Sequence, residues 1–357
     1  MIKSNVQHDS TIQQEIVKMG QEKTEPQTRK NRGKIKISEF QIFAEKTGVY
    51  LIALLLIIIG GIYSDQFLTA ENFLNITRNA ALLGIVVAGA SFVTYVGHYA
   101  DLSIPAIIPL SGIVSVTLLP YGIYVAIIGG ILAGTLIGVM NGYVVGYLKA
   151  NPILWTLAVA FFMEGLMRFA MSNNQIYPDS SPGTSGESFV ALYRSSFLGI
   201  PIYVIAMFLM IIASAYIYKK TRFGKEVKLV GSSYDVAEGS GINTRKTVFY
   251  SFLFTAFSAS VAGIFITSFN KTGVYYLGQG YDFQAVTAIV LGGMTLSGGR
   301  GNIIGVLGGV FVIGLLANLM TFIGIHPFQQ NIVIGTIFIF VVGLNQYQLR
   351  KMGRDHG

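Results

Sequence analysis

Two oppositely charged residues lie within one apolar run of the sequence, where a charge needs a partner. Glu164 and Arg168 are four positions apart, the spacing at which side chains meet on one face of a helix. Two roles are open to them: an intramembrane ion pair, or ligands of a polar solute. Mutual neutralisation is the commoner way to keep charge at depth in a membrane, so the spacing favours the ion pair.

A second polar group interrupts the apolar pattern between two runs. Asp101 and Ser103 stand just before an apolar segment, where their oxygens can cap the helix that begins there. Asn141 and Thr156 are polar residues in later runs. Such residues either tie helices together or contact a solute. We take Asp101, Ser103, Asn141 and Thr156 as candidate residues of a translocation pathway.

Several kinds of chemistry are excluded by composition. The sequence has no cysteine, which excludes disulfides, cysteine-bound metals and thiol nucleophiles. Its four histidines (His8, His98, His326 and His356) are too scattered to suggest a metal cluster. No Gly-x-x-x-x-Gly-Lys-Ser/Thr phosphate-binding loop occurs. We therefore expect no catalytic residue, no metal and no cofactor bound by this chain.

One long charged segment separates two apolar runs, at residues 219–246. It contains seven Lys or Arg and three acidic residues, and it ends in Ser240-Gly241-Ile242. Residues 231–242 are compatible with a short helix whose small side chains let another protein approach closely. The segment therefore resembles a docking loop for a soluble partner. An ordinary solvated loop is the alternative.

The composition places the rest of the chain in a membrane. Hydrophobic residues make up 52% of the sequence and charged residues 12%. A spanning helix needs roughly 20 apolar residues. We identify ten runs, which predict an all-α, polytopic membrane protein with eight to ten spans: 47–64, 79–97, 104–119, 121–147, 153–171, 199–218, 247–269, 283–299, 302–324 and 328–346.

The distribution of cations predicts the orientation. If the N-terminus is inside, 21 of the 25 Lys and Arg residues are cytoplasmic, so both termini are expected inside. The domains are then a basic, disordered cytoplasmic tail at 1–46, a membrane domain at 47–346 and a second cytoplasmic tail at 347–357. The tail at 1–46 either binds anionic lipid headgroups or simply enforces this orientation.

Glycines concentrate near the end of the eighth run. Gly292, Gly293, Gly298 and Gly299 bracket a short polar stretch, and such density breaks a helix and lets backbones approach closely. Interrupted spans often lie at a moving gate in transporters. Close helix packing is the other interpretation, and the sequence favours it.

Four blocks of residues follow one another along the chain. The first two are Asp101-Leu102-Ser103, and Asn141-Gly142 with Asn151-Pro152 and Thr156-Leu157. The third is Phe223-Gly224 with Gly231 and Ser240-Gly241-Ile242, and the fourth, the most specific, is LGGMTLSGGRG from Leu291 to Gly301. In this order the blocks resemble the permease subunits of bacterial ABC importers of the ribose, xylose, galactose and autoinducer-2 type, and the resemblance covers residues 48–346.

The resemblance implies an assembly and a cellular place. The chain would lie in the bacterial cytoplasmic (inner) membrane with a second permease copy, identical or paralogous. An ATP-binding cassette subunit would hold ATP and Mg and do the hydrolysis, and an extracytoplasmic binding protein would deliver the solute. The positions implied to dock the ATPase are Gly231, Asp235, Ala237, Ser240, Gly241 and Ile242.

Departures from the family pattern leave more than one class of transported solute possible. His98, Glu164, Glu238 and Gly239 differ from the residues usual at their positions. A monosaccharide or sugar-like solute is the expectation. An amino-acid or nucleoside ABC permease is an alternative within the class, and an ion-coupled secondary transporter is an alternative outside it. A membrane enzyme is the weakest possibility, since no nucleophile with its base is evident.

Overall fold

The computed structural model describes residues 48–97 and 100–354, and for residues 327, 328 and 344–354 it describes the backbone alone. The basic segment expected at 1–46 lies outside the described residues. The last helix continues to Arg354, so most of the segment expected as a tail at 347–357 is helical.

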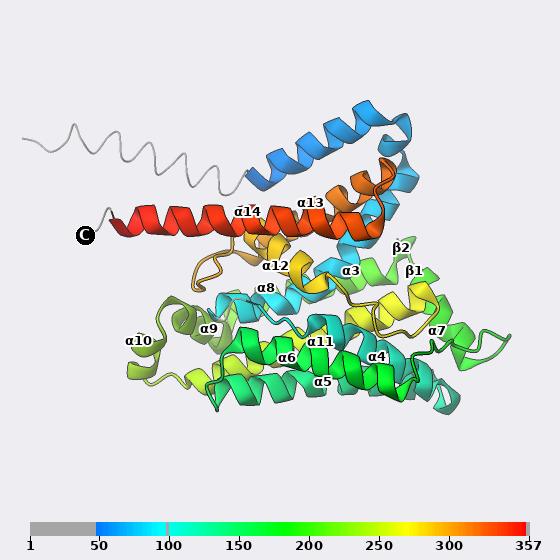
Figure 1. Ribbon diagram of the computed structural model, residues 1–357, viewed down its shortest axis with the longest axis horizontal. Helices are drawn as coiled ribbons and strands as arrows, with labels where there is room; N and C mark the ends of the chain where they lie inside the picture. The colour runs from blue at the N-terminus through cyan, green and yellow to red at the C-terminus, as the bar shows by residue number, and fades with distance from the viewer. Residues whose placement is uncertain (1–47, 98–99, 355–357) are drawn as a thin grey trace, which may run out of the picture. The chain divides into compact units, whose positions relative to one another are not determined.

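Helices make up nearly all of the described chain. Two short 3-10 helices, η1 (Asp65–Leu68) and η2 (Leu119–Tyr121), accompany the α-helices. An apolar helix, Gly48–Tyr63, precedes η1. The others are α3 (Ala70–Tyr95), α4 (Ile104–Leu118), α5 (Ile123–Gly146), α6 (Pro152–Ala170), α7 (Ser185–Arg194), α8 (Ile202–Lys220), α9 (Arg222–Ser232), α10 (Tyr234–Gly239), α11 (Thr244–Asn270), α12 (Tyr281–Leu291), α13 (Ile303–Phe322) and α14 (Pro327–Arg354), as Figure 1 shows.

Each of the ten apolar runs forms a helix, which confirms the predicted polytopic helical architecture. In the described part of the chain, seven helices are long and apolar enough to cross a membrane, and three apolar helices are shorter. Three boundaries were predicted wrongly. The second run was expected to begin at residue 79, but α3 begins at Ala70, and the tenth was expected to end at residue 346, but α14 continues to Arg354. The eighth run was expected to reach residue 299, but α12 ends at Leu291 and Gly292 is its C-terminal cap.

Short polar residues set the starts of several helices. Thr69 accepts a hydrogen bond from the Asn72 N–H through its hydroxyl at 3.3 Å. Asn151 accepts one from the Leu154 N–H at 3.2 Å, and Pro152 follows it at the first helical position. These contacts satisfy backbone donors that a helix leaves free at its first turn.

The core is formed by α3 and α11, which other helices surround. Residues 80–95 of α3 are buried without interruption, the pattern of a helix enclosed on all sides. Small polar residues bring the two helices close: the Thr255 hydroxyl donates to the Gly89 carbonyl at 3.2 Å, and the Ser258 hydroxyl donates to the Val86 carbonyl at 3.1 Å. These contacts pack α3 against α11 with little side-chain volume between them.

Two more packing devices fix the surrounding helices. On α5, Gly138 and Gly142 face α11, and an added Cβ would lie 2.9 Å from the Phe252 carbonyl oxygen and 2.7 Å from the Phe249 carbonyl oxygen, respectively. This spacing is the small-residue seam typical of membrane helices. Asn72 of α3 and Asn318 of α13 exchange two side-chain hydrogen bonds, at 2.7 and 3.1 Å.

The connections cluster at two opposite ends of the helices (Figure 1). One end carries α7 and the strands β1 (Ser196–Phe197) and β2 (Ile200–Pro201), which pair antiparallel. The loop of residues 271–280 lies there too, joined by an isolated bridge between Ile176 and Gly273. The other end carries α9 and α10.

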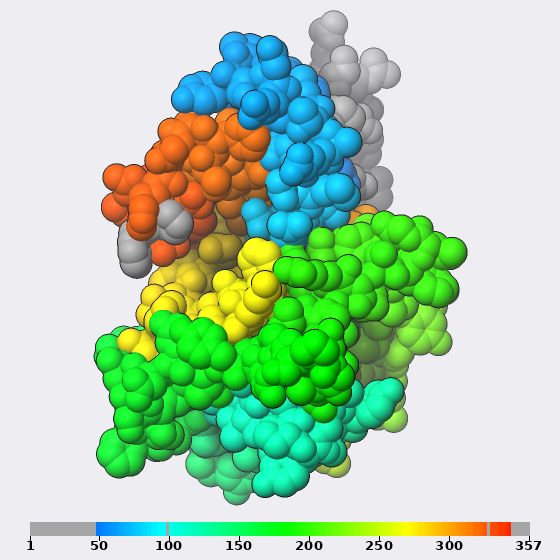
Figure 2. Space-filling model, turned by 90° about the vertical axis from the view of Figure 1, so that its right-hand side faces the viewer, coloured from blue at the N-terminus to red at the C-terminus, as the bar shows by residue number. Residues whose placement is uncertain are grey.

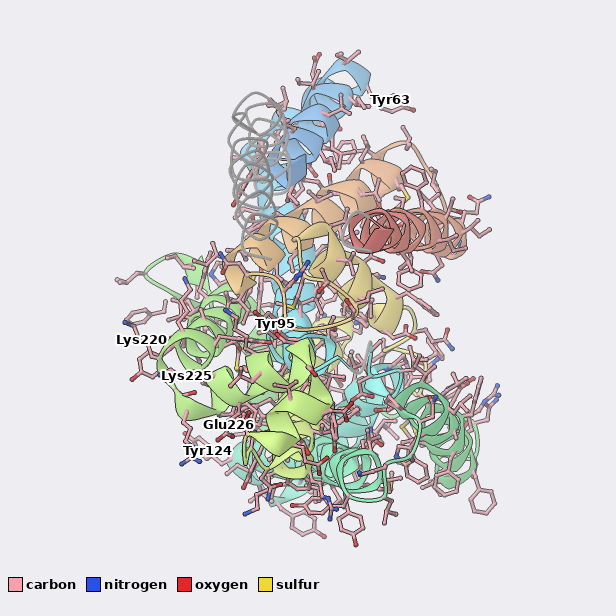
Figure 3. The ribbon with its side chains drawn as sticks, turned by 90° about the vertical axis from the view of Figure 1, so that its left-hand side faces the viewer. Tyr63, Tyr95, Tyr124, Lys220, Lys225 and Glu226 are labelled. Carbon is pink, nitrogen blue, oxygen red and sulfur yellow. The ribbon has the colours of Figure 1, made fainter. Side chains whose placement is uncertain are left out.

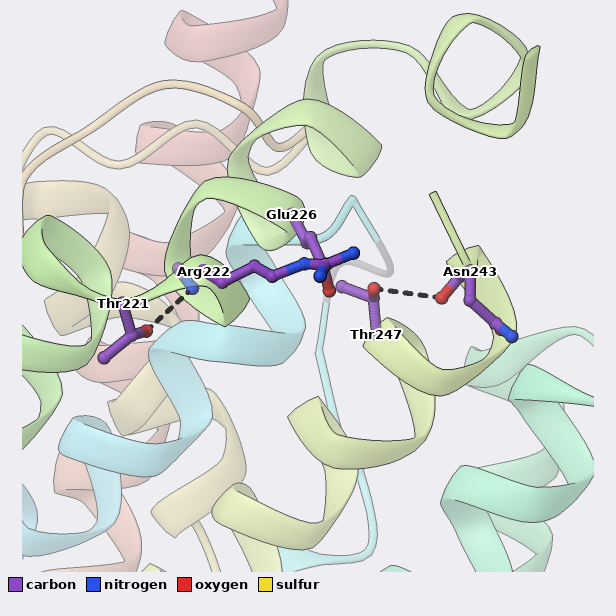
Figure 4. A network of polar contacts seen from close by, with 6 residues as sticks. Thr221, Arg222, Glu226, Asn243 and Thr247 are labelled. Carbon is purple, nitrogen blue, oxygen red and sulfur yellow. Dashed lines mark hydrogen bonds and ion pairs between the residues drawn. The ribbon is translucent and has the colours of Figure 1, made fainter. Parts of the chain in front are cut away.

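The α9–α10 end carries much of the exposed charge of segment 219–246. Lys220 and Lys225 lie at its outer edge, whereas Tyr95, the last residue of α3, lies further in (Figure 3). Arg222 and Glu226 form an ion pair at 2.9 Å across one turn of α9 (Figure 4). Because Arg222 is almost fully exposed, this pair contributes little to stability.

Candidate functional site

The polar residues around the α3–α4 connection form one hydrogen-bond network. The Asp101 Oδ1 atom accepts from the Ser103 N–H at 2.9 Å and from the Ser103 hydroxyl at 2.6 Å. The Asn141 side-chain amide on α5 donates to the Ser103 oxygen at 2.8 Å. The network thus ties the start of α4 to α5. Ser103 is the N-cap residue of α4, but no side-chain oxygen accepts a hydrogen bond from the first turn, so the predicted capping by Asp101 and Ser103 is not formed. The Asp101 carboxylate binds Ser103 instead.

The network continues to α6. The Trp155 indole N–H donates to the Asn141 amide oxygen at 3.0 Å, and the Thr156 hydroxyl accepts from the Leu102 N–H at 3.1 Å. The structure therefore brings together the four predicted pathway residues, Asp101, Ser103, Asn141 and Thr156. All four are at most 2% exposed. In this conformation they join α4, α5 and α6 and do not present a free surface to a solute.

A cavity of about 660 Å³ lies next to this network. Its wall comes from the start of α4, one face of α6, the end of the 271–280 loop with the start of α12, and α14. Leu102 belongs both to the wall and to the hydrogen-bonded segment. Figure 2 shows residues 270–290, in yellow, between the orange and green segments on the face turned to the viewer. The network thus positions the inner end of the cavity.

Five polar side chains line the cavity among apolar and aromatic ones. Leu157, Phe161 and Glu164 lie on successive turns of α6 and point to the same side. The other polar lining residues are Tyr275, Gln279, Asp282 and Asn331. Carboxylates, amides and a phenol are the groups that exchange hydrogen bonds with hydroxyls. Aromatic rings such as Phe161 supply a face for stacking.

The predicted ion pair between Glu164 and Arg168 is not formed in this structure. Arg168 is exposed, and its guanidinium lies over the Tyr275 ring, 4.7 Å from the centroid, and donates to the Tyr275 hydroxyl at 3.1 Å. Glu164 instead lines the cavity. In the described part of the chain, one ion pair is formed, and it joins Arg222 to Glu226. Arg168 thus contacts Tyr275 of the 271–280 loop and not Glu164, its neighbour on α6.

Three of the six predicted docking residues are exposed, and the other three face inward. The expected single helix over 231–242 is two: Gly231 lies near the end of α9, and α10 follows after Ser233. Asp235, Ser240 and Gly241 are exposed, as are Val236 and Glu238 beside them. Ala237 is 2% exposed and Ile242 packs against the core, so these two hold α10 to the domain. Gly231 faces inward.

The Ser-Gly-Ile sequence at the end of α10 has a definite structural role. The Ile242 N–H donates to the Ala237 carbonyl at 3.1 Å and the Gly241 N–H donates to the Glu238 carbonyl at 3.0 Å. This pair of bonds is the Schellman motif, which needs a left-handed residue after the helix. Gly241 provides it with φ of +80°. The motif ends α10 and turns the chain into α11.

The glycine-rich stretch after α12 is an ordered loop. Gly293, Gly298 and Gly299 have φ of +84°, +83° and +71°, which side chains other than glycine rarely adopt. Gly292 packs against α13, where an added Cβ would lie 2.6 Å from the Val306 nitrogen. The four glycines therefore serve close packing and turn geometry, and their role as a gate stays a prediction.

Sequence reasoning missed part of the cavity wall. Asp282 was available as a buried carboxylate at the start of an apolar run, and Asn331 as an amide within the last run. Tyr275 and Gln279 stand in a connecting loop, and nothing local to the sequence places them opposite α6. Trp155 was likewise overlooked as a member of the polar network.

Comparison with protein families gives a match over most of the chain. Residues 72–342 match the family model described as "Branched-chain amino acid transport system / permease component". The matched range contains the polar network, the cavity and the α9–α10 segment. No solved structure matches the chain significantly.

Curated relatives match at nearly full length. The ribose import permease protein RbsC of Bacillus subtilis is 33% identical over 85% of this chain and 93% of its own length. The D-allose transport system permease protein AlsC of Escherichia coli is 27% identical over 86% of this chain and 93% of its own. The galactose/methyl galactoside import permease protein MglC of Escherichia coli is 27% identical over 87% and 97%. The chain belongs to the family of the branched-chain amino acid transport system permease component.

Proposed function

We propose that this chain is the membrane subunit of an ATP-driven importer in the bacterial cytoplasmic (inner) membrane, and that it translocates a monosaccharide or sugar-like molecule. The observation that carries the solute class is the nearly full-length similarity to permeases named for ribose, D-allose and galactose. The chain covers 93–97% of these relatives, so the proposal concerns the whole permease.

The chemistry of the cavity is consistent with a neutral polyhydroxylated solute. Glu164 and Asp282 accept hydrogen bonds from hydroxyls, and the amides of Gln279 and Asn331 both donate and accept them. Among the described lining residues there is no Lys, Arg or His. A free amino acid carries a carboxylate as well as an ammonium group, and the described part of this wall offers no cation to its carboxylate. The cavity therefore supports a sugar over the amino acid that the family description suggests.

The energy source in this proposal is a separate ATPase subunit, which carries ATP and Mg. The sequence has no phosphate-binding loop of its own. The exposed face of α10, with Asp235, Val236 and Glu238, provides a compact surface for that subunit. A solute-loaded binding protein would approach the opposite end, at α7 and the 271–280 loop.

A second permease copy completes the proposed assembly. The outward faces of α6 and α14 carry large apolar side chains, including Phe162, Phe169 and Ile332 at 67%, 85% and 70% exposure. A second copy or lipid would cover these faces, since large contiguous apolar faces are not left in water. The copy could be identical or a paralogue.

Uptake measurements test the solute class. The chain, its co-purified ATPase and its binding protein are reconstituted in liposomes, and uptake of radiolabelled ribose, allose, galactose and leucine is compared. We expect uptake of at least one sugar and none of leucine. Uptake of leucine alone would support the amino-acid alternative and overturn the sugar proposal.

A matched pair of variants tests the cavity. Glu164→Gln removes a carboxylate from the wall, and we expect sugar uptake at low concentration to fall by about 10-fold, as a lost hydrogen bond to a charged acceptor implies. Glu187→Gln is the control. The Glu187 carboxylate on α7 accepts a hydrogen bond from the Gly183 N–H and does not line the cavity. Equal effects of the two changes would argue that the cavity does not bind the solute.

A further inference from the structure

Three backbone segments that are distant in sequence meet beside the proposed docking surface. They are residues 95–97 at the end of α3, 231–232 at the end of α9, and 297–299 in the α12–α13 loop; together we name them the glycine junction. The Gly299 N–H donates to the Tyr95 carbonyl at 2.9 Å. Tyr95 lies beside the α9–α10 segment in Figure 3.

The segments of the glycine junction touch without side chains between them. A Cβ added at Gly231 would overlap the Tyr95 carbonyl oxygen and lie 2.6 Å from the Gly299 nitrogen. A Cβ at Gly298 would lie 2.7 Å from the Gly97 Cα atom. Real Cβ atoms do not approach other atoms so closely. Any displacement of α9 must therefore carry the loop with it or open a gap at its backbone.

The α12–α13 loop is bonded to α12, since the Met294 N–H donates to the Ile289 carbonyl at 3.2 Å, and it is closed by hydrogen bonds of its own. The Thr295 N–H donates to the Arg300 carbonyl at 3.1 Å, and the Thr295 hydroxyl donates to the Gly298 carbonyl at 3.0 Å. At the end of α12, a Cβ added at Gly309 of α13 would lie 3.0 Å from the Gly292 nitrogen. The loop and the adjoining ends of α12 and α13 are thus closely packed and move as one body.

The far end of α12 reaches the cavity. The helix has 11 residues and is therefore about 16 Å long. Asp282 and Phe283, in its first turn, line the cavity, and its last residue precedes the glycine-rich loop. One short helix therefore connects the glycine junction to the proposed solute site.

We infer that the glycine junction transmits movement of α9 and α10 through α12 to the cavity, and that Gly97, Gly231, Gly298 and Gly299 are positioning residues for coupling ATP hydrolysis to transport. This inference rests on the proposed function. It assigns Gly231 a place inside the transmission and not on the docking surface. The partner subunit would bias a two-state equilibrium by moving α10, and α12 would change the cavity in response.

A graded series of alanine variants tests the inference. Gly231→Ala inserts a methyl group into the tightest contact. Gly97→Ala meets nothing nearer than the Ser297 carbonyl oxygen at 3.3 Å, and its cost comes mainly from the backbone φ of +88°. Gly239→Ala is the matched control, because Gly239 is in the same segment with open space around it. We expect ribose uptake per ATP hydrolysed to fall by about 10-fold or more in Gly231→Ala and by less in Gly97→Ala, within the usual range of coupling energies. Gly239→Ala should leave this ratio unchanged.

A fluorescent label on α12 reads the transmission without any solute. The natural chain has no cysteine, so Phe283→Cys, at a residue that is 44% exposed, gives a single labelling site at the cavity. We expect emission in the complex to change on addition of ATP with vanadate, and this change to disappear in Gly231→Ala.

The two readouts separate this inference from the proposed function. A label that responds while no sugar is taken up would contradict the sugar proposal and keep the transmission. Normal uptake and a normal label response in folded Gly231→Ala would overturn the inference. If Gly231→Ala does not fold, a normal label response and uptake ratio in Gly97→Ala would overturn it as well.

Discussion

Replacing Asn141 by leucine should weaken the contact between α4, α5 and α6. Asn141 is fully buried, and its side chain donates to Ser103 at 2.8 Å and accepts from Trp155 at 3.0 Å. Hydrogen bonds between membrane helices contribute about 0.6 kcal/mol on average and at most about 1.7. Trp155 is only half-buried, so its N–H can find another partner. We therefore expect the free energy of unfolding to fall by about 1–2 kcal/mol.

The single tryptophan of the chain makes this change directly observable. Unfolding in mixed detergent can be followed by Trp155 emission, because no other indole contributes. In folded Asn141→Leu the emission should move to shorter wavelength, since an apolar side chain replaces the polar amide that contacts the indole. Thr117→Val is the control: its hydroxyl is exposed and bonds only within its own helix, so stability and emission should stay unchanged.

A double-mutant cycle with Trp155→Phe isolates the bond. The losses of unfolding free energy in the two single variants should add up to about 0.5–1.5 kcal/mol more than the loss in the double variant. Thermal unfolding followed by circular dichroism measures all three losses. Strictly additive losses, together with an unshifted emission in Asn141→Leu, would refute the network as we describe it.

Three further outcomes are expected. Gly241→Ala should weaken binding of the ATPase subunit in a pull-down because alanine at φ of +80° is strained by about 1 kcal/mol, whereas Gly239→Ala should not. Asn318→Leu should lower the free energy of unfolding by about 1–3 kcal/mol because the buried Asn72 side-chain oxygen loses its donor, while the Asn72 amide nitrogen keeps the Phe67 carbonyl. Hydrogen bonds from the serine two residues later lower the pKa of Asp179, which is outside the spanning helices. That turn is stabilised above the usual carboxyl pKa, and the protection of its amide hydrogens, measured relative to the intrinsic exchange rate at each pH, should decrease as pH falls through the lowered pKa; Asp179→Asn should remove this pH dependence.

Each of these expectations has a contradicting result. Equal binding by the Gly241 and Gly239 variants would mean that the Schellman turn does not orient α10. An Asn318→Leu protein as stable as the natural one would mean that the asparagine pair contributes nothing. If amide protection in the 179–181 turn depends on pH in the same way in Asp179→Asn and in the natural protein, the Asp179 carboxylate does not stabilise this turn.

Local sequence features predicted the apolar helices and some of the contacts. Apolar runs located all ten apolar helices, because a membrane helix must present apolar residues on every exposed side. Asp101, Ser103, Asn141 and Thr156 were selected as polar residues costly to bury, and such residues seek one another in a packed core. That same pairing is why they join helices here and do not line the cavity surface.

Contacts between distant segments could not be predicted in this way. The spacing of Glu164 and Arg168 was correct for an ion pair, but Tyr275, more than 100 residues later, offers the guanidinium both a ring and a hydroxyl. Gly231 was assigned to a docking surface because the family resemblance implied it, yet the Tyr95 carbonyl and Gly299 enclose it. Both outcomes depend on which segments the fold brings together, and the sequence near each residue carries no signal of that.

The most direct test of an ATP-driven permease is the energy source of accumulation. Liposomes that contain the chain, with or without its ATPase subunit, are loaded with ATP or given a proton or sodium gradient, and radiolabelled ribose inside is measured with the binding protein outside. We predict accumulation only when both the ATPase subunit and ATP are present, and none with a hydrolysis-deficient ATPase. Accumulation by the chain alone, driven by an ion gradient, would contradict the account.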